Sequence, residues 1–266
     1  MLCVQRSGYY KYVKKLTLHK EDRSVKLITE IKALSRLSRN SYGSRQIAKN
    51  LQAKGYNVGR HRARTLMRKA GIECKQRRRY RVITQSKHSL SIADNVLNRR
   101  FEVAELNRAW VADITYLWTN EGWLYIAAVL DLFSRRVIGW AMADHMKENL
   151  VCNALQMAVG RRKPASGLIH HSDRGVQYAS NKYQVTLKGM GIIVSMSRKG
   201  NCWDNAVMER FFGSLKSERT DKTKYLTRRA AMSDIVDYIE VFYNSQRLHS
   251  TLGYVTPLQY ELANGQ

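Results

Sequence analysis

The stretch WVADITYLW, residues 110–118, alternates bulky apolar residues with smaller or polar ones and places Asp113 in the middle of a predicted strand. The next stretch, EGWLYIAAVLDLFSRRVIGWAM (residues 121–142), contains two more strand patterns around a turn at residues 131–136. Short connections between such strands predict an antiparallel meander of three strands.

Strands and helices alternate after this meander. Apolar strand patterns at residues 167–171 and 192–196 follow helical patterns at residues 149–161 and 180–188. A meander continued in this way predicts an α/β fold with a mixed five-stranded sheet and flanking helices. Further helical patterns lie at residues 205–218 and 228–244.

Residues 23–72 contain three shorter helical patterns. The first, at residues 24–37, repeats apolar residues at helical spacing: Val25, Ile28, Ile31, Leu34 and Leu37. The second begins at Ser44 and ends at Gly55, and the third spans residues 60–70. Two helices joined by a short turn that contains glycine predict a small all-α helix-turn-helix domain. The basic residues expected on the outer, DNA-binding face of the third helix are Arg60, His61, Arg64, Arg68 and Lys69. The alternative is a solvated basic helix in a three-helix bundle.

The positive charge is concentrated in the N-terminal part of the chain. The whole chain of 266 residues has a formal net charge of +25, and residues 1–100 contain 26 Lys or Arg but only 5 Asp or Glu. Repulsion among so many positive charges does not stabilise a fold, so a polyanionic partner is the natural explanation for the excess of basic residues. Double-stranded DNA is the partner that the helix-turn-helix pattern favours; a ribosome-associated protein is the alternative.

The composition also suggests where the domains end. Residues 1–22 form a basic N-terminal segment, residues 73–104 form a basic and aperiodic linker, and residues 105–266 form the α/β domain. Within the linker, Arg77, Arg78 and Arg79 are expected to neutralise DNA phosphates without reading base sequence, unless the linker is only a solvated spacer. No stretch is long and apolar enough to span a membrane, which predicts a cytoplasmic protein without a membrane partner.

Three carboxylates stand out as candidates for catalysis. Asp113 lies among apolar strand residues, where a buried carboxylate is costly unless it is paired or bound to a cation. Asp173 follows the apolar strand GLIHH, at the end of a strand where ligands bind in α/β sheets, and Glu209 lies in the helix DNAVMERFFGSLK. Taken singly, each has an ordinary alternative: a buried partner of an arginine, a turn residue and a surface helix residue.

Together the three carboxylates predict a metal site. Oxygen ligands suit Mg²⁺, and two such ions support in-line displacement at a phosphodiester. The four cysteines form no CxxC pair, which argues against a structural zinc site. Together with a basic DNA-binding region, the pattern predicts metal-assisted phosphoryl transfer on DNA.

Several long motifs resemble one family. WVADITYLW, DLFSRRVIGWAM, HHSDRGVQYAS, SMSRKGNCWDNAVMERFFGSLKSE and YNSQRLHSTLGYVTPLQYE are similar to motifs of the DDE transposases of bacterial insertion sequences, specifically the second-reading-frame product of two-frame elements. The N-terminal SYGSRQIAKNLQAKGYNVGRHRARTLMRKAGI resembles the helix-turn-helix of that family. The resemblance covers roughly residues 24–261.

The resemblance implies an RNase H-like, retroviral-integrase-like catalytic domain that cuts element ends and joins them to target DNA. It implies Mg²⁺ as cofactor, as two ions for which Mn²⁺ is a substitute, with Asp113, Asp173 and Glu209 as catalytic residues and metal ligands. It also implies a homo-oligomer on nucleoid DNA, and an upstream-frame partner or fusion that adds DNA binding and dimerisation. No heptad repeat of the kind such a partner supplies is visible in this chain.

Other residues near these motifs have weaker assignments. Asn205, one turn before Glu209, is expected to orient that carboxylate or to contact DNA, and Lys216, two turns beyond it, to bind phosphate. Arg247 and His249 are equally consistent with structural and functional roles. Two other functions remain open: a DNA-binding regulator with an inactive catalytic domain, and an RNase H-like nuclease without joining activity.

Overall fold

The computed structural model describes residues 5–74, 90–221 and 223–265, and for residues 15–23 and Cys202 it describes the backbone alone. The chain divides into two compact units, Met1–Gln76 and Arg77–Gln266. Arg77, Arg78 and Arg79, the linker residues expected to contact phosphate, lie outside the described residues.

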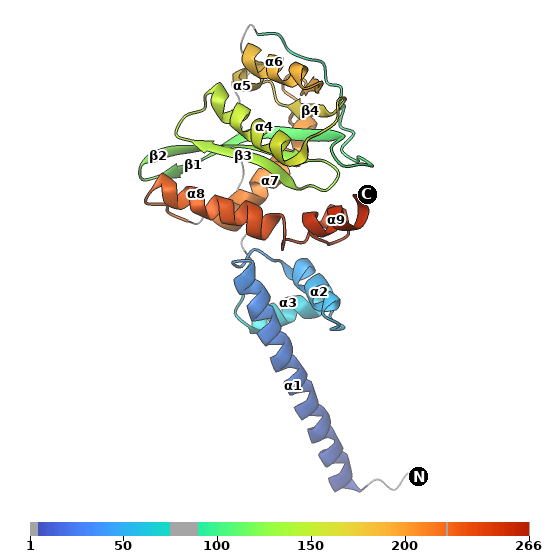
Figure 1. Cartoon of the computed structure of the whole chain (residues 1–266). Coiled ribbons are helices and arrows are strands. Elements are labelled where there is room, and N and C mark those ends of the chain that lie inside the picture. Colours follow the sequence, from blue (N-terminus) through green and yellow to red (C-terminus); the bar gives the residue numbers. More distant parts are fainter. Residues whose placement is uncertain (1–4, 75–89, 222, 266) are drawn as a thin grey trace. The chain divides into compact units, whose positions relative to one another are not determined.

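The N-terminal unit is built from helices α1 (Arg6–Leu37), α2 (Ser44–Ala53) and α3 (Arg60–Lys69) (Figure 1). Its core is made by small and aliphatic side chains from all three helices: Leu27, Ile31, Leu34, Ile47, Ala48, Leu51, Ala63, Leu66 and Met67. Gly55 has a φ of +82° in the turn after α2, a conformation that glycine adopts without strain. The predicted arrangement of three helices with a glycine-containing turn is confirmed.

Two details of α1 differ from the sequence prediction. The helix begins at Arg6, far before residue 24, because no proline interrupts the segment and an established helix propagates readily. Its buried stripe contains Leu27, whereas Val25 and Leu37 are exposed. The expected inward stripe was therefore wrong at both ends, because the buried side of α1 passes through Leu27, Ile31, Leu34 and Ser38, and Val25 and Leu37 lie off that side.

The second unit contains a five-stranded sheet with the order β3-β2-β1-β4-β5. Its strands are β1 (Ala109–Thr119), β2 (Gly122–Asp131), β3 (Val137–Ala143), β4 (Ile169–Ser172) and β5 (Ile193–Met196). β1, β2 and β3 pair antiparallel, whereas β4 is parallel to both β1 and β5. The predicted mixed five-stranded sheet is confirmed.

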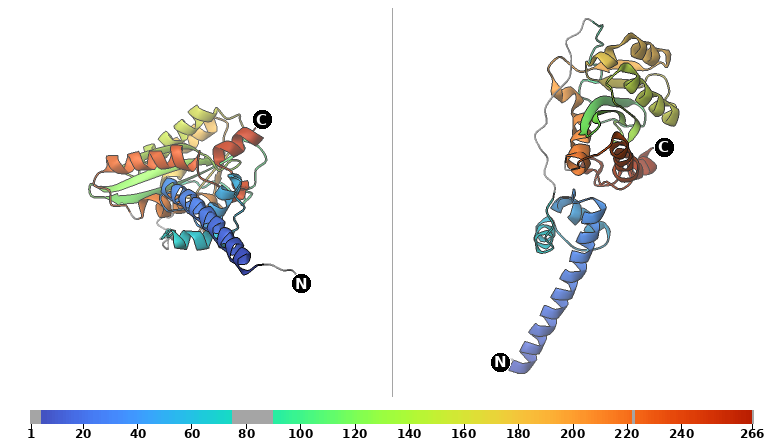
Figure 2. Two further views of the ribbon diagram at one scale, coloured as in Figure 1. Left: turned by 90° about the horizontal axis from the view of Figure 1, so that it is seen from below. Right: turned by 90° about the vertical axis from the view of Figure 1, so that its left-hand side faces the viewer.

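Helices cover both faces of this sheet. α4 (Glu148–Arg162), α5 (Val176–Ala179) and α6 (Asn181–Gly189) lie on one face, and α7 (Ala206–Leu215) and α8 (Arg228–Val236) lie on the other (Figures 1 and 2). The main core lies under α4, which approaches β3 at Gly139, where a Cβ atom would come within 2.2 Å of the Ala154 carbonyl oxygen. Glycine is therefore required for this contact.

The C-terminal helices depart from regular α-geometry. α7 continues into a π-helical turn, η2 (Lys216–Thr220), and α8 continues into a second π-helix, η3 (Asp237–Tyr243). The two π segments meet around Glu218, which accepts hydrogen bonds from Arg247 and from the Tyr238 hydroxyl. Two short 3-10 helices, η1 (Cys202–Asn205) and η4 (Ser250–Leu252), and the capped helix α9 (Pro257–Asn264) complete the unit.

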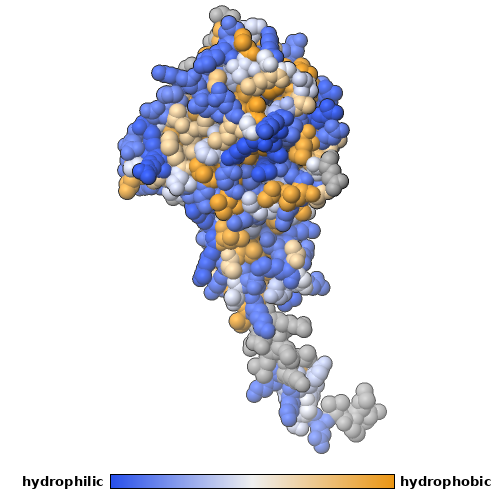
Figure 3. All heavy atoms as spheres, viewed as in Figure 1, coloured by the Kyte–Doolittle hydropathy of each residue, from blue (hydrophilic) through white to orange (hydrophobic). Residues whose placement is uncertain are grey.

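The surface seen in Figure 3 is largely hydrophilic, with apolar patches between the polar areas. No helix among the described residues is both long enough and apolar enough to cross a membrane.

Candidate functional site

Asp113 lies in β1, at the point where the strand loses one of its neighbours. β4 pairs with Ala109, Trp110 and Val111, whereas β2 pairs with β1 as far as Thr119. The Asp113 side chain accepts a hydrogen bond from the backbone N–H of Ile114 at 2.8 Å. This carboxylate is therefore held at the end of the β1–β4 pairing.

Asp173 occupies the corresponding position after β4. Val111 and His171 are register partners, and Asp113 and Asp173 each lie two residues beyond that pair. The Asp173 Oδ1 atom accepts a hydrogen bond from the backbone N–H of Gly175 at 2.9 Å, and a Cβ at that glycine would stand only 3.0 Å from the same oxygen. Parallel pairing thus brings both aspartates to the same edge of the sheet.

Glu209 is carried by α7, whose start is bonded to β1 just beyond the residues that pair with β4. The helix buries the apolar side that its sequence predicts, formed by Met208, Phe211, Phe212 and Leu215. Glu209 itself is exposed, one residue beyond Met208. Just before the helix, the buried Asn205 donates its side-chain amide to the Ala112 carbonyl oxygen at 3.3 Å. Because Ala112 precedes Asp113, this bond fastens the start of α7 next to the first aspartate.

The three carboxylates interact electrostatically. Burial raises the pKa of Asp113 well above its ordinary value, and the negative charges of Asp173 and Glu209 raise it further. Burial also raises the pKa of Glu209. The parallel pairing of β1 with β4 and the bond from Asn205 to Ala112 direct the same three residues toward one edge of the sheet.

The donor set suits a hard divalent cation. A buried carboxylate that is repelled by two other carboxylates is stabilised when a cation neutralises it, and oxygen ligands are those that Mg²⁺ prefers. Among the residues that the structure describes, however, no set of three or more His, Cys, Asp or Glu side chains is gathered closely enough to hold a metal ion. The carboxylates are neighbours without forming a ready-made cage.

Lys216 lies beside the same group of acids. Its Nζ atom is 5.2 Å from the centre of the Tyr116 ring, and its positive charge lowers the pKa of Asp113. Burial lowers the pKa of Lys216 itself. The structure therefore places this lysine beside β1, the strand that carries Asp113, and the sequence predicted a phosphate contact for it.

The candidate DNA contacts on α3 are on the surface. The helix buries Ala63, Leu66 and Met67 against the core of the N-terminal unit. The basic residues predicted to face outward are all exposed: Arg60, His61, Arg64, Arg68 and Lys69. This exposure satisfies a requirement for DNA binding by α3.

One residue of the site region was missed by the sequence analysis. Asp204, between Trp203 and Asn205, is fully buried and accepts hydrogen bonds from Arg99, Arg198 and Asn95. In sequence it has the features of a polar loop residue. The only local signal is Arg198 six residues earlier, because the other two partners come from about a hundred residues away.

Family models match most of the chain. An integrase core domain model matches residues 104–202, a second integrase core domain model matches residues 209–264, and an HTH-like domain model matches residues 21–80. The matched regions include each of the three carboxylates.

Similar proteins cover nearly the full length. The chain is 42% identical over 257 residues to the insertion element IS600 uncharacterized 31 kDa protein of Shigella sonnei, covering 97% of this chain and 94% of that protein. It is 38% identical over 266 residues to transposase InsF for insertion sequence IS3A of Escherichia coli (strain K12), covering 99% and 92%. A solved structure of the HTLV-2 integrase catalytic core domain in complex with magnesium (trimeric form) aligns with a TM-score of 0.46 at 16% identity, over 59% of this chain and 97% of that chain.

Proposed function

This chain belongs to the DDE transposases of insertion sequences, and on that basis we propose that it cuts DNA at the ends of its element and joins those ends to target DNA. In this proposal Asp113, Asp173 and Glu209 are the catalytic residues and the ligands of Mg²⁺. The observation that carries the proposal is geometric: parallel pairing brings Asp113 and Asp173 to the same edge of the sheet, and Asn205 fastens the start of the helix that carries Glu209 to the residue before Asp113.

The proposed chemistry follows from what these side chains do. Their oxygens hold the cations, and their fixed positions on β1, after β4 and on α7 set where the scissile phosphate binds. When bound, two Mg²⁺ ions, or Mn²⁺ as a substitute, would activate the attacking oxygen and stabilise the leaving oxygen. Lys216 is proposed to contact a DNA phosphate beside Asp113, because its side chain lies over the ring of Tyr116 on the same strand.

The remaining parts of the chain are proposed to bind DNA. Residues 23–72 present α3 to double-stranded DNA, the linker at residues 73–104 follows the phosphate backbone, and residues 105–266 carry the chemistry. The protein is proposed to assemble as a homo-oligomer on nucleoid DNA, alone or with an upstream-frame partner. The exposed basic side of α3 supports the first of these assignments.

The proposal is tested with a labelled duplex that carries an element end, a target plasmid and Mg²⁺. Joining of the label to the plasmid is the expected result. A product that is only nicked would indicate a nuclease without joining activity, and bound but uncut DNA would indicate a regulator with an inactive catalytic domain.

Variants then test the three carboxylates. Asp113→Asn, Asp173→Asn and Glu209→Gln are each expected to abolish joining while DNA affinity, measured by gel shift, stays near that of the parent protein. The matched control is Asp144→Asn, because the Asp144 side chain is 61% exposed and lies outside the site. Joining that persists in any one of the three site variants would remove that residue from the proposed triad.

A further inference from the structure

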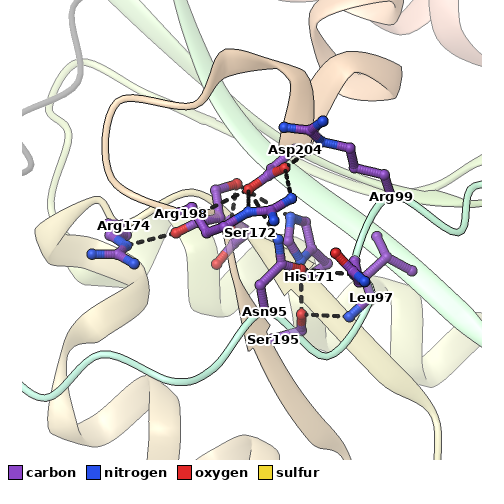
Figure 4. A network of polar contacts seen from close by, with 11 residues as sticks. Asn95, Leu97, Arg99, His171, Ser172, Arg174, Ser195, Arg198 and Asp204 are labelled. Atoms are coloured by element: carbon purple, nitrogen blue, oxygen red, sulfur yellow. Dashed lines mark hydrogen bonds and ion pairs between the residues drawn. The ribbon is translucent and has the colours of Figure 1, made fainter.

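Asp204 is the centre of a network of polar side chains (Figure 4). Its Oδ1 atom accepts hydrogen bonds from Arg99 Nε at 2.7 Å and from Arg198 Nη2 at 2.8 Å. Its Oδ2 atom accepts from the backbone N–H of Arg198, from Arg198 Nε and from Asn95 Nδ2, each at 2.9 Å. These bonds hold the pKa of Asp204 far below its ordinary value, with the side-chain bonds of Arg198 contributing most. The carboxylate is therefore ionised, and both of its oxygens accept hydrogen bonds.

The network joins parts of the chain that are distant in sequence. Asn95 and Arg99 belong to the segment before β1, whereas Arg198 follows β5. The same segment is tied to the sheet because the Leu97 backbone N–H donates to the Ser195 hydroxyl at 3.1 Å. Asp204 thus fastens the loop before α7 to a segment that is itself anchored on β5.

Most of the described residues between Arg198 and Asp204 lie on the surface. Lys199 is exposed, Gly200 has a left-handed φ of +70°, and the Trp203 side chain is 69% exposed. Asp204, at 0% exposure, and Asn205, at 6%, are the next two residues and both are buried. The place where the loop becomes helix is therefore fixed by these two polar side chains.

Asn205 links the start of α7 to the edge of the sheet where Asp113 and Asp173 lie. Its amide donates to the Ala112 carbonyl oxygen, directly before Asp113, while Asp204 holds the neighbouring backbone. Glu209 follows about one turn later on α7 and is exposed, so the backbone of the helix determines where its carboxylate lies.

We propose that Asp204 is a positioning residue for Glu209: clamped by Arg99, Arg198 and Asn95, it sets the start of α7 so that Glu209 can share a metal ion with Asp113 and Asp173. The inference rests on the proposed function of the three carboxylates. Asp204 acts through α7 and contacts neither metal nor DNA.

The test uses the full chain and compares the parent protein with Asp204→Asn, which keeps the shape but removes the charge. Mg²⁺ binding is measured by calorimetry without DNA, and hydrogen exchange is measured along the chain. The variant is expected to bind Mg²⁺ about tenfold more weakly, as is typical when a group that orients metal ligands is lost. Exchange is expected to rise in residues 198–215 and to stay unchanged in β1 and β2.

Strand cleavage provides a second comparison. In Asp204→Asn, cleavage is expected to recover as Mg²⁺ is raised, because the ligands are intact and only their placement is loosened. Glu209→Gln, which removes a ligand, is expected not to recover at any Mg²⁺ concentration. Glu105→Gln is the matched control, because it breaks a 2.7 Å pair with Arg108 in which both side chains are mostly exposed.

The outcome that overturns the inference is Mg²⁺ affinity and hydrogen exchange in Asp204→Asn equal to those of the parent protein. If that variant does not fold, Arg99→Gln decides, because it removes only one half-exposed partner of the clamp. A smaller weakening of Mg²⁺ binding is then expected, and an unchanged affinity would refute the role of the clamp. Mg²⁺ binding without DNA separates this result from a failure of the proposed joining activity.

Discussion

The side-chain amide of Asn205 donates a hydrogen bond to the main-chain oxygen of Ala112, 93 residues earlier in the sequence. This bond joins the helix that carries Glu209 to the strand that carries Asp113. Asn205 is 6% exposed, so in this structure its position suits the orientation of the acidic residues better than contact with DNA.

Asn205→Ala is therefore expected to reduce strand cleavage and to lower the free energy of unfolding by about 1 kcal/mol, the usual contribution of one hydrogen bond. DNA affinity, measured by fluorescence anisotropy, should not change. The exposed Asn149 gives the control Asn149→Ala. Weaker DNA binding with unchanged stability would instead favour the direct contact that the sequence suggested.

The buried pair of Arg247 and Glu218 supplies a second prediction. Arg247→Met is expected to lower the free energy of unfolding by about 3–5 kcal/mol, because Glu218 would be left buried without its cation. Urea unfolding measures the change, and the double variant with Glu218→Gln should recover much of it. Arg161→Met is the control, since its pair with Glu240 is partly exposed, at 43% and 30% of the two side chains, and should contribute at most about 1 kcal/mol. A loss as small as that of the control would argue against a structural role for Arg247.

Buried histidines predict how stability depends on pH. Burial lowers the pKa of His170 to about 3, that of His171 to about 4 and that of His249 to about 3. Below about pH 6.5 the unfolded chain takes up protons that the folded chain does not, so the folded state loses about 1.4 kcal/mol per pH unit for each histidine. The loss continues down to about pH 4.

Unfolding by urea at several values between pH 7.5 and pH 5 tests this dependence. His170→Gln should change the slope by about 1.4 kcal/mol per pH unit, the contribution of one histidine, because Gln does not titrate and its amide can still bond to the Tyr183 hydroxyl, the partner of His170 Nε2 at 3.1 Å. A slope that is the same with and without His170 would contradict the assignment.

The exposed basic side of α3 predicts a salt effect. Arg64→Ala is expected to weaken DNA binding and to reduce the slope of log affinity against log salt concentration by about 1, the effect of one lost phosphate contact. Lys188→Ala, an exposed basic residue on α6 of the other unit, is the control. Equal slopes for the Arg64 variant and the parent protein would place DNA contact elsewhere.

The strands could be predicted from sequence because their signals are local. Alternation in β1 and apolar runs in β4 and β5 are visible within a few residues. The positions of Asp113 within β1 and of Asp173 directly after β4 follow from the same patterns.

Features that depend on distant contacts could not be predicted. Asp204 is buried because Asn95, 109 residues earlier, and two arginines surround it, and no local pattern encodes that meeting. The π-helical geometry of η2 and η3 accompanies the tertiary contact between Glu218 and Tyr238. The sequence predicted ordinary helices there, since a π segment of five or seven residues within a longer helix is too short for a change of periodicity to be recognised.

The β1–β4 pairing ends at Val111, and this affects how readily one molecule can pair with another during folding. Beyond Val111, β1 has no partner strand on that side among residues 90–221, and an open edge of this kind invites a strand from another molecule. Asn205 occupies the carbonyl of Ala112, and Tyr225 bridges Thr119 at the far end. The start of α7, the helix that carries Glu209, therefore also covers part of this open edge and opposes strand pairing between molecules.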